Sequence, residues 1–435
     1  MHLGVTLMLR LLCSAVAVAA LRTCDVTAFG AKGDNATEDT AALQAALDAC
    51  TPGETVLPAP GKYLSRSLNF TGKSNIVLRI EAGATLVLWP DVATWNASGT
   101  FSDFLSNAAF HRARAGTGAR SSSWVSNVTV TGGGEIDGQG WRWWPLFPQP
   151  RPRLVSFEAV TGFELSNLTL RNSPSWNTNL RGSHIRITNV TVLSNAGSCD
   201  GFTAAPTTDG FNVGGDNIYI SDCYVHNGDD CIPVFAYNGT DTFNVLVERV
   251  QCHCGTNGGV AVLGDDYCGG QNASIYNVTF RDMVVNRTNQ GAGVKICEPF
   301  ATPHGTVSNV TWSNVTISNP RNVPLYTNVF TEDGCNIPVN ASARVDWLST
   351  AGLTFSSVHA EVRNGMPAGC FMCTAERPCT GMVFDDVVVT AAGGTPAPYV
   401  CMNADVASAV GSTPQPCGSD KMIAPSHAKL VGATK

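Results

Sequence analysis

The chain has 435 residues, of which 44% are hydrophobic and only 14% are charged, and its net charge is −7 at pH 7. Because so much apolar sequence can bury a large core, an intrinsically disordered chain is excluded. Nucleic acid is also excluded as a partner, since phosphate binding needs clustered cations and no block of Lys or Arg stands out.

The first twenty residues are predicted to be a signal peptide. The apolar run Leu11–Leu21 follows Arg10 and is too short for a bilayer, which needs about 20 residues. Val18-Ala19-Ala20 supplies small residues for cleavage. With no linker-like break later in the chain, we expect one domain over residues 21–435, monomeric, secreted and not bound to a membrane.

Cysteines and sequons agree with secretion. The sequence has 16 cysteines, and removal of Cys13 with the signal peptide leaves an odd number, which predicts several disulfides and at least one free thiol. Sequons inside strand-like runs are interpreted as buried Asn that bond to the backbone: Asn167, Asn189, Asn277 and Asn314. Sequons in loops are the better glycan sites: Asn96, Asn238, Asn272 and Asn340.

One amphipathic helix is predicted, over Thr37–Cys50. Thr37 is its expected N-cap, residues such as Leu43 and Leu47 recur at helical spacing, and Pro52-Gly53 ends it.

Elsewhere a six-residue strand cassette recurs, in which apolar and polar residues alternate around an Asn, an Asp or another polar residue. The third residue of each cassette is apolar: Leu165, Ile187, Ile220, Val247, Phe280, Trp312, Phe355 and Phe384. Repeats at loose intervals of roughly 20–50 residues, with no helix between the strands, are typical of a solenoid. We therefore predict an all-β, single-stranded right-handed parallel β-helix, with stacked core residues, Asn ladders at the turns and the helix capping the N-terminal end.

Three carboxylates form the candidate site. Asp209 lies in Thr208-Asp209-Gly210, and Asp229 and Asp230 lie about one coil later in Gly228-Asp229-Asp230-Cys231. Neighbouring coils would bring these groups within roughly 5–9 Å, the separation that hydrolysis of glycosidic bonds uses. Mutual repulsion would raise at least one pKa and so supply an acid near neutral pH. We expect the three to share one exposed cleft, reached by a kink that Gly228 permits.

With these motifs the sequence resembles glycoside hydrolase family 28, the polygalacturonases and related pectin hydrolases. Further segments carry the resemblance: Val26–Asp34, Ser173-Pro174-Ser175-Trp176, and Thr207 in place of the family Asn before Thr208. The resemblance implies inverting hydrolysis of a pectin-type polysaccharide, without cofactor or metal. Asp229 would be the general acid, Asp209 and Asp230 would activate the attacking water, and Lys295 would bind the substrate.

The sequence departs from the family pattern at two binding positions. The family His falls on Gly258 and the Arg of its R-I-K motif falls on Gly293, while its Tyr has no clean match, although Tyr326 is near. We therefore expect weak activity on plain polygalacturonate unless another cation, such as Arg281 or Arg287, reaches the site. Restoring both residues, Gly258→His with Gly293→Arg, is expected to raise that activity.

Three other functions stay open. One is a hydrolase of another pectic polymer, of rhamnogalacturonan or xylogalacturonan type. A pectate-lyase-like enzyme would need an acidic Ca²⁺ site, for which Asp265-Asp266 is only a turn candidate, and a low-activity carbohydrate-binding homologue would not need the close carboxylates. Tryptophans able to stack on sugars fit every alternative: Trp141, Trp143, Trp144 and Trp176.

A disulfide between Cys231 and Cys254 is predicted, because Cys231 follows the acidic pair and Cys254 lies on the next coil. Further expected pairs are Cys24–Cys50, Cys401–Cys417 and Cys370–Cys373.

Overall fold

The computed structural model describes residues 22–90, 103–109, 121–122, 124–194, 199, 204–236, 239–255, 261–263, 273–296, 305–329, 348–373, 375 and 377–417. The predicted signal peptide and the loop sequons Asn96, Asn238, Asn272 and Asn340 lie outside these residues. Within the described part of the chain, no helix is long and apolar enough to cross a membrane.

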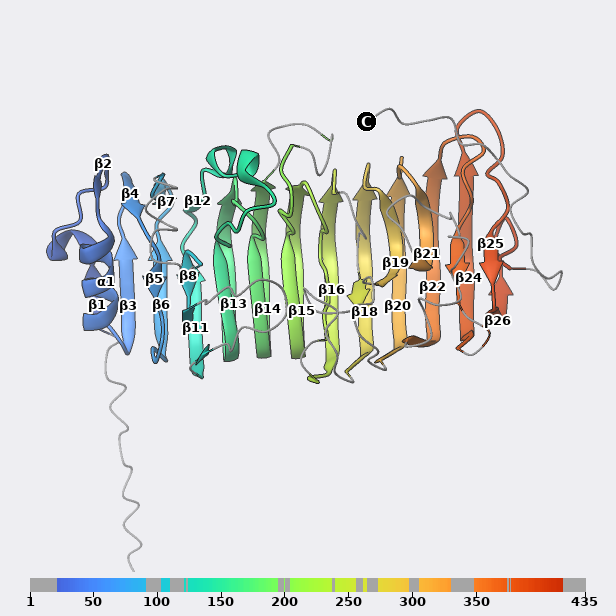
Figure 1. Cartoon of the computed structure of the whole chain (residues 1–435), viewed down its shortest axis with the longest axis horizontal. Helices are drawn as coiled ribbons and strands as arrows, with labels where there is room; N and C mark the ends of the chain where they lie inside the picture. Colours follow the sequence, from blue (N-terminus) through green and yellow to red (C-terminus); the bar gives the residue numbers. More distant parts are fainter. Residues whose placement is uncertain are drawn as a thin grey trace, which may run out of the picture.

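The described chain is a right-handed parallel β-helix, as predicted, and Figure 1 shows its coils side by side in one long row. One sheet contains the strands β1 (Thr23–Asp25), β2 (Asp34–Glu38), β3 (Gly53–Leu57), β4 (Gly61–Ser65), β5 (Leu68–Asn69), β6 (Ile76–Ile80), β7 (Ala84–Leu88), β8 (Leu105–Ser106), β11 (Val125–Thr131), β12 (Glu135–Asp137), β13 (Val155–Arg171), β14 (Thr178–Ser194), β15 (Phe211–Asn227), β16 (Thr242–His253), β18 (Ser274–Asn286), β20 (Gly305–Ser318), β22 (Leu348–Val362), β24 (Cys379–Ala391) and β26 (Ala404–Val410). A second parallel sheet contains β17 (Ala261–Leu263), β19 (Gln290–Ile296), β21 (Val323–Val329), β23 (Cys370–Met372) and β25 (Val400–Met402). The remaining elements are the short pair β9 (Ala108–Ala109) and β10 (Ser121–Ser122), and the 3₁₀ turns η1 (Val26–Phe29), η2 (Gly140–Arg142) and η3 (Trp144–Leu146).

The cassette residues stack in one register through the core. Leu165 pairs with Ile187, Ile187 with Ile220, and the same row continues through Val247, Phe280, Trp312, Phe355 and Phe384. All eight side chains are fully buried. The aromatic members lie ring against ring, with Trp312 and Phe355 centred 4.8 Å apart. Because each coil repeats the same inward position, the row forms one continuous apolar column.

Asparagines at the turns form the predicted ladders, but they are exposed rather than buried. Asn189 donates from Nδ2 to Oδ1 of Asn167 at 2.9 Å, and Asn314 donates to Asp282 at 2.7 Å. Asn167, Asn189, Asn277 and Asn314 all have φ between 52° and 54°. Asn tolerates this left-handed conformation better than most residues, so the turn selects it and its side chain points to solvent. The interpretation as buried Asn was therefore wrong.

The capping helix is shorter than predicted. α1 spans Thr40–Ala49, and Thr37 lies in β2 instead of capping the helix. Asp39 is at the N-cap position, but its carboxylate accepts from the backbone N–H groups of Lys32 and Gly33, at 2.7 and 3.0 Å. The helix closes the N-terminal end of the core, as Figure 1 shows, with its apolar face buried at Leu43, Ala46 and Leu47.

Cysteine pairing outside the candidate site is confirmed in part. Two predicted disulfides are present: Cys24–Cys50 and Cys401–Cys417. Cys370–Cys373 was wrong, because Cys373 pairs with Cys379, the first residue of β24, and Cys370 is disulfide-bonded elsewhere. Cys223 is a free, buried thiol, as the odd count predicted.

Candidate active site

Asp209 lies where the chain enters β15. The backbone N–H of Asn177, one coil earlier, donates to the Asp209 carbonyl at 2.9 Å, which fixes the backbone in register. The side chain of Asn212 donates to Asp209 Oδ2 at 2.9 Å and orients the carboxylate. Sequence reasoning did not single out Asn212. The available signal was its position: Asn212 is a polar residue only three positions after Asp209, near the start of the strand that follows the turn.

Asp229 and Asp230 follow the end of β15, one coil after Asp209. Gly210 N–H donates to the Asp230 carbonyl at 2.8 Å, so the two acidic segments are directly stacked. The Asp230 N–H donates to Asp229 Oδ1 at 3.0 Å, which turns the Asp229 carboxylate back over its own backbone. Gly228 is needed for close approach, because a Cβ there would lie 2.2 Å from the Ala205 carbonyl oxygen.

A buried polar frame holds these turns together. The Asn227 side chain donates to the carbonyls of Thr208 and Asp230, at 2.9 and 2.8 Å. The Thr208 hydroxyl accepts from Gly228 N–H at 2.9 Å. Because buried hydrogen bonds of this kind are costly to break, the frame fixes the carboxylate-bearing segments relative to one another.

Lys295 reaches the acids from β19, two coils further on. Its Nζ lies 3.1 and 3.4 Å from the two carboxylate oxygens of Asp230. Burial alone would lower the pKa of Lys295, but Asp230, Asp229 and Asp209 together raise it. Sequence reasoning therefore brought together four groups that the structure also places together.

The acid cluster favours a bound proton. Burial, and then the charges of Asp229 and Asp230, raise the pKa of Asp209 well above its usual range, although Asn212 and Lys295 oppose the shift. The three carboxyl residues are only 5–7% exposed, rather than open to solvent as the sequence led us to expect. Such a cluster can offer one acid and one ionised base at the same pH.

Gly293 faces Tyr326 across the second sheet. A Cβ on Gly293 would lie 2.0 Å from the Tyr326 carbonyl oxygen and 2.6 Å from its ring. Tyr326 is fully buried, and burial and then the Asp230 charge raise the pKa of its hydroxyl well above the usual range. The strand has no room for a side chain at Gly293. The packing therefore argues against the gain in polygalacturonate hydrolysis that was expected from Gly293→Arg. Gly258 lies outside the described residues.

The other basic candidates differ in where they lie. Arg281 does not reach the acids, because it is ion-paired with Glu248. His253, five residues before the position where the family His falls, packs with its ring 5.1 Å from that of Tyr224. Arg287 is exposed at the turn after β18, the same corner at which Asp229 lies on an earlier coil.

The four tryptophans differ in exposure and in their place relative to the acidic segments. Trp143 and Trp144 are buried, and Trp141 is exposed on η2. Trp176 directly precedes Asn177, which is bonded to Asp209, and its half-buried ring lies 3.9 Å from the Arg153 guanidinium carbon. Its sequence position therefore links Trp176, through Asn177, to the segment that carries Asp209.

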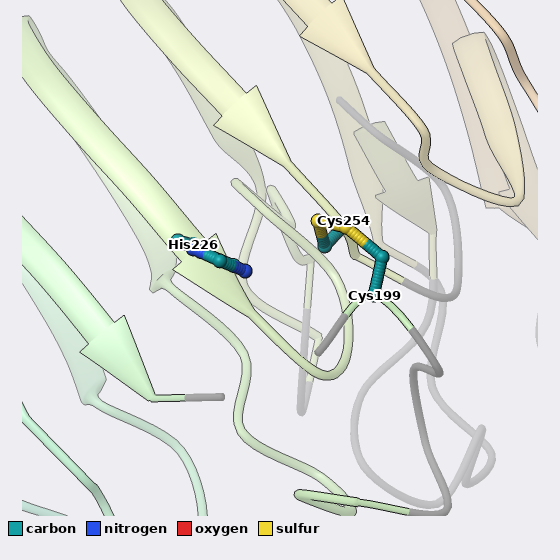
Figure 2. A group of neighbouring side chains, drawn as sticks. All are labelled: Cys199, His226 and Cys254. Carbon is teal, nitrogen blue, oxygen red and sulfur yellow. A yellow bond between two sulfur atoms is a disulfide. The ribbon is translucent and has the colours of Figure 1, made fainter. Parts of the chain in front are cut away.

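Two disulfides lie beside the turn that carries Asp229 and Asp230. The predicted pair Cys231–Cys254 was wrong. Cys231 pairs with Cys252 in the core, and Cys254 pairs with Cys199. Figure 2 shows the Cys199–Cys254 bond beside His226, with the potential ligand atoms of the three residues within 4.8 Å of one another. Because both sulfurs are joined in a disulfide, they offer no thiolate to a metal ion.

Comparison with known proteins places this geometry in a family. The model of Glycosyl hydrolases family 28 matches residues 106–410. Exopolygalacturonase from Zea mays is 27% identical over 393 residues, which cover 87% of each chain. Endo-xylogalacturonan hydrolase from Aspergillus tubingensis is 22% identical with a TM-score of 0.69, over 90% of this chain and 100% of that one. Polygalacturonase from Erwinia carotovora is 20% identical with a TM-score of 0.64, over 89% and 97%.

Proposed function

Because the chain belongs to glycosyl hydrolases family 28 and is therefore a glycosidase, we propose that it hydrolyses pectin-type galacturonan with inversion of configuration. The observation that carries the proposal is the meeting of Asp209, Asp229 and Asp230 with Lys295. The disulfides fit an oxidising compartment and support a secreted, extracellular enzyme. We propose that residues 21–435 act as one monomeric catalytic domain.

The proposed roles are those that the family resemblance implies, and the charges in the cluster support them in part. Asp230 is ion-paired with Lys295 and is therefore the ionised partner suited to take a proton from water. The raised pKa of Asp209 supports a proton within the cluster, and coupled carboxylates titrate as a group. Asp229 gives this proton to the leaving glycosidic oxygen, while Asp209 and Asp230 activate the water that attacks the anomeric carbon from the opposite face.

The test compares Asp229→Asn with Asp230→Asn on two kinds of substrate. On polygalacturonate, Asp229→Asn should reduce release of reducing ends by at least 10²-fold, because a general acid contributes typically 10²–10⁴-fold. On a galacturonide with a nitrophenol leaving group, which departs without protonation, Asp229→Asn should recover most of the activity and Asp230→Asn should not.

Two further results would decide the assignment. Full activity of Asp229→Asn on polygalacturonate would contradict the acid role, provided that its unfolding temperature matches the wild type. The anomeric configuration of the first product, followed by NMR, should be opposite to that of the substrate, and retention would refute the inverting mechanism.

A hydrolase of a branched galacturonan, of xylogalacturonan type, is the second candidate. The observation that favours it is Gly293, which removes a guanidinium from the cleaved bond and is closed to any side chain by Tyr326. One such contact is commonly worth about 2–4 kcal/mol in the transition state. Parallel assays on polygalacturonate, rhamnogalacturonan and xylogalacturonan separate the candidates, and we expect plain polygalacturonate to be a weak substrate.

A further inference from the structure

We propose that Arg287, Arg321 and Arg363 form a binding edge for the carboxylates of a polyuronate chain. We name these three residues the arginine ridge. The inference rests on the proposed function, and it concerns the sugars beyond the cleaved bond rather than the bond itself.

The arginine ridge continues the column of turns that begins at the acids. Gly255 lies against Asp229, because a Cβ on Gly255 would be 2.6 Å from the Asp229 carbonyl oxygen. Asn289 N–H donates to Gly255 O at 3.1 Å, and Asn322 N–H donates to Asn289 O at 2.8 Å. These turns follow the long strands β15, β16, β18 and β20, whose arrowheads line one edge of the β-helix in Figure 1. The ridge therefore starts two coils from Asp229 and runs toward the C-terminus.

The guanidinium groups of Arg321 and Arg363 donate hydrogen bonds to backbone carbonyls of earlier coils. Arg321 Nη2 donates to the carbonyls of Cys254 and Arg287, at 3.4 and 3.3 Å. Arg363 Nη2 donates to the carbonyl of Arg321. Neighbouring coils are about 4.8 Å apart, which is comparable to the length of one sugar residue in an extended chain. The three arginines start on successive coils, so the ridge distributes its cations along the row of turns.

Several arginines elsewhere in the described chain are neutralised by a carboxylate. Arg79, Arg171 and Arg281 each pair with a glutamate. By contrast, no carboxylate among the described residues lies within ion-pair distance of Arg287 or Arg363. In a chain of net charge −7, clustered cations of this kind create a local positive potential. Guanidinium groups match carboxylates through two parallel donors, which favours a uronate over a neutral sugar.

The location predicts which kinetic constant the ridge controls. Because the arginines start two coils from Asp229, they contact sugars that do not change during bond cleavage. Contacts of this kind stabilise the bound substrate and the transition state equally, so their loss raises KM and leaves kcat unchanged.

The experiment measures binding separately from turnover. Arg287→Gln and Arg363→Gln are introduced singly and together into Asp229→Asn, and retardation is measured in gels that contain polygalacturonate. Each exposed pair should be worth about threefold in affinity, and the double variant about tenfold. Arg321 is left unchanged because its guanidinium bonds to two coils of backbone. Lys62→Gln, an exposed cation on β4, is the charge-matched control and should have no effect.

The outcomes separate the ridge from the proposed function. The ridge is supported if the double variant is retarded less than its parent by polygalacturonate and equally by fully methyl-esterified pectin. This holds whether or not the enzyme turns over the polymer. An unchanged double variant overturns the ridge, even if hydrolysis still depends on Asp229. An equal loss on dextran sulfate, or an equal loss in Lys62→Gln, would mean a nonspecific polyanion effect and would also overturn it.

Discussion

Replacing Lys295 by Met should destabilise the protein most at the pH at which the acid cluster carries most negative charge. Lys295 Nζ lies 3.1 Å from Asp230 Oδ2, and the side chains are 25% and 6% exposed. Two unit charges about 4 Å apart attract by about 4 kcal/mol at an effective dielectric constant near 20. Removing one partner of a buried pair typically costs about 3–5 kcal/mol. Because Lys295 is a quarter exposed, we expect a loss of about 2–3 kcal/mol at pH 7.5.

The pH dependence follows from the direction of each shift. The pKa of Asp209 is raised in the folded state, chiefly by burial and then by its acidic neighbours. The folded protein therefore binds this proton more tightly than the unfolded chain, and stability falls as pH rises from the ordinary Asp value toward the raised one. The pKa of Lys295 is raised above 10.5, so its own contribution is constant at neutral and acid pH and is lost only at higher pH. Without Lys295 the cluster binds its proton still more tightly, so the deficit of the variant should shrink on acidification.

Urea unfolding at pH 7.5 and pH 5 measures this difference. We expect the loss of stability caused by Lys295→Met to be smaller at pH 5 than at pH 7.5. Lys62→Met should change stability by less than about 0.5 kcal/mol at either pH, as surface substitutions usually do. A Lys295→Met deficit that is equal at both pH values, or larger at pH 5, would refute the electrostatic account of the cluster.

Two other substitutions test the local packing. Gly293→Ala should lower stability by about 1–3 kcal/mol in urea unfolding, because its Cβ would overlap the Tyr326 carbonyl, and wild-type stability would contradict this close approach. Thr207→Asn should raise the unfolding temperature by a few degrees, because Thr207 has a φ of 55°, where a β-branched residue is strained by about 1–2 kcal/mol and Asn is tolerated. A lower temperature would mean that the bond from Arg151 to the Thr207 hydroxyl outweighs the strain.

The core was predictable because one residue position repeats in every coil. Alternation within each cassette predicted which side chains face inward, and stacking of parallel coils then fixed their partners, so Trp312 and Phe355 meet as expected. The helix start was less predictable, because Asp39 and Thr37 both suit an N-cap and only the bonds from Lys32 and Gly33 decide how Asp39 is used.

The disulfide pairing could not be predicted from spacing. In a regular strand Cys252 and Cys254 would point to the same side, and either would suit Cys231. Cys254 lies beyond the end of β16 with a φ of 64°, so its side chain leaves the core and meets Cys199, while Cys252 remains inside. The left-handed conformation of Cys254, which the cysteine spacing does not reveal, therefore decides that Cys252 and not Cys254 pairs with Cys231.

Gly293 and Tyr326 are better understood as one departure from the family pattern than as two. Aligned residue by residue, the chain loses an arginine at Gly293 and has a tyrosine without a clean match. Paired across the second sheet, the Tyr326 carbonyl and ring occupy the space that any side chain at Gly293 would need. Restoring the arginine alone therefore restores no contact, since the strand pair would first have to separate. Lys295 is then the cation that this strand pair still offers to an acidic substrate. Further cations must come from outside the pair, and the arginine ridge lies on the next corner of the same coils.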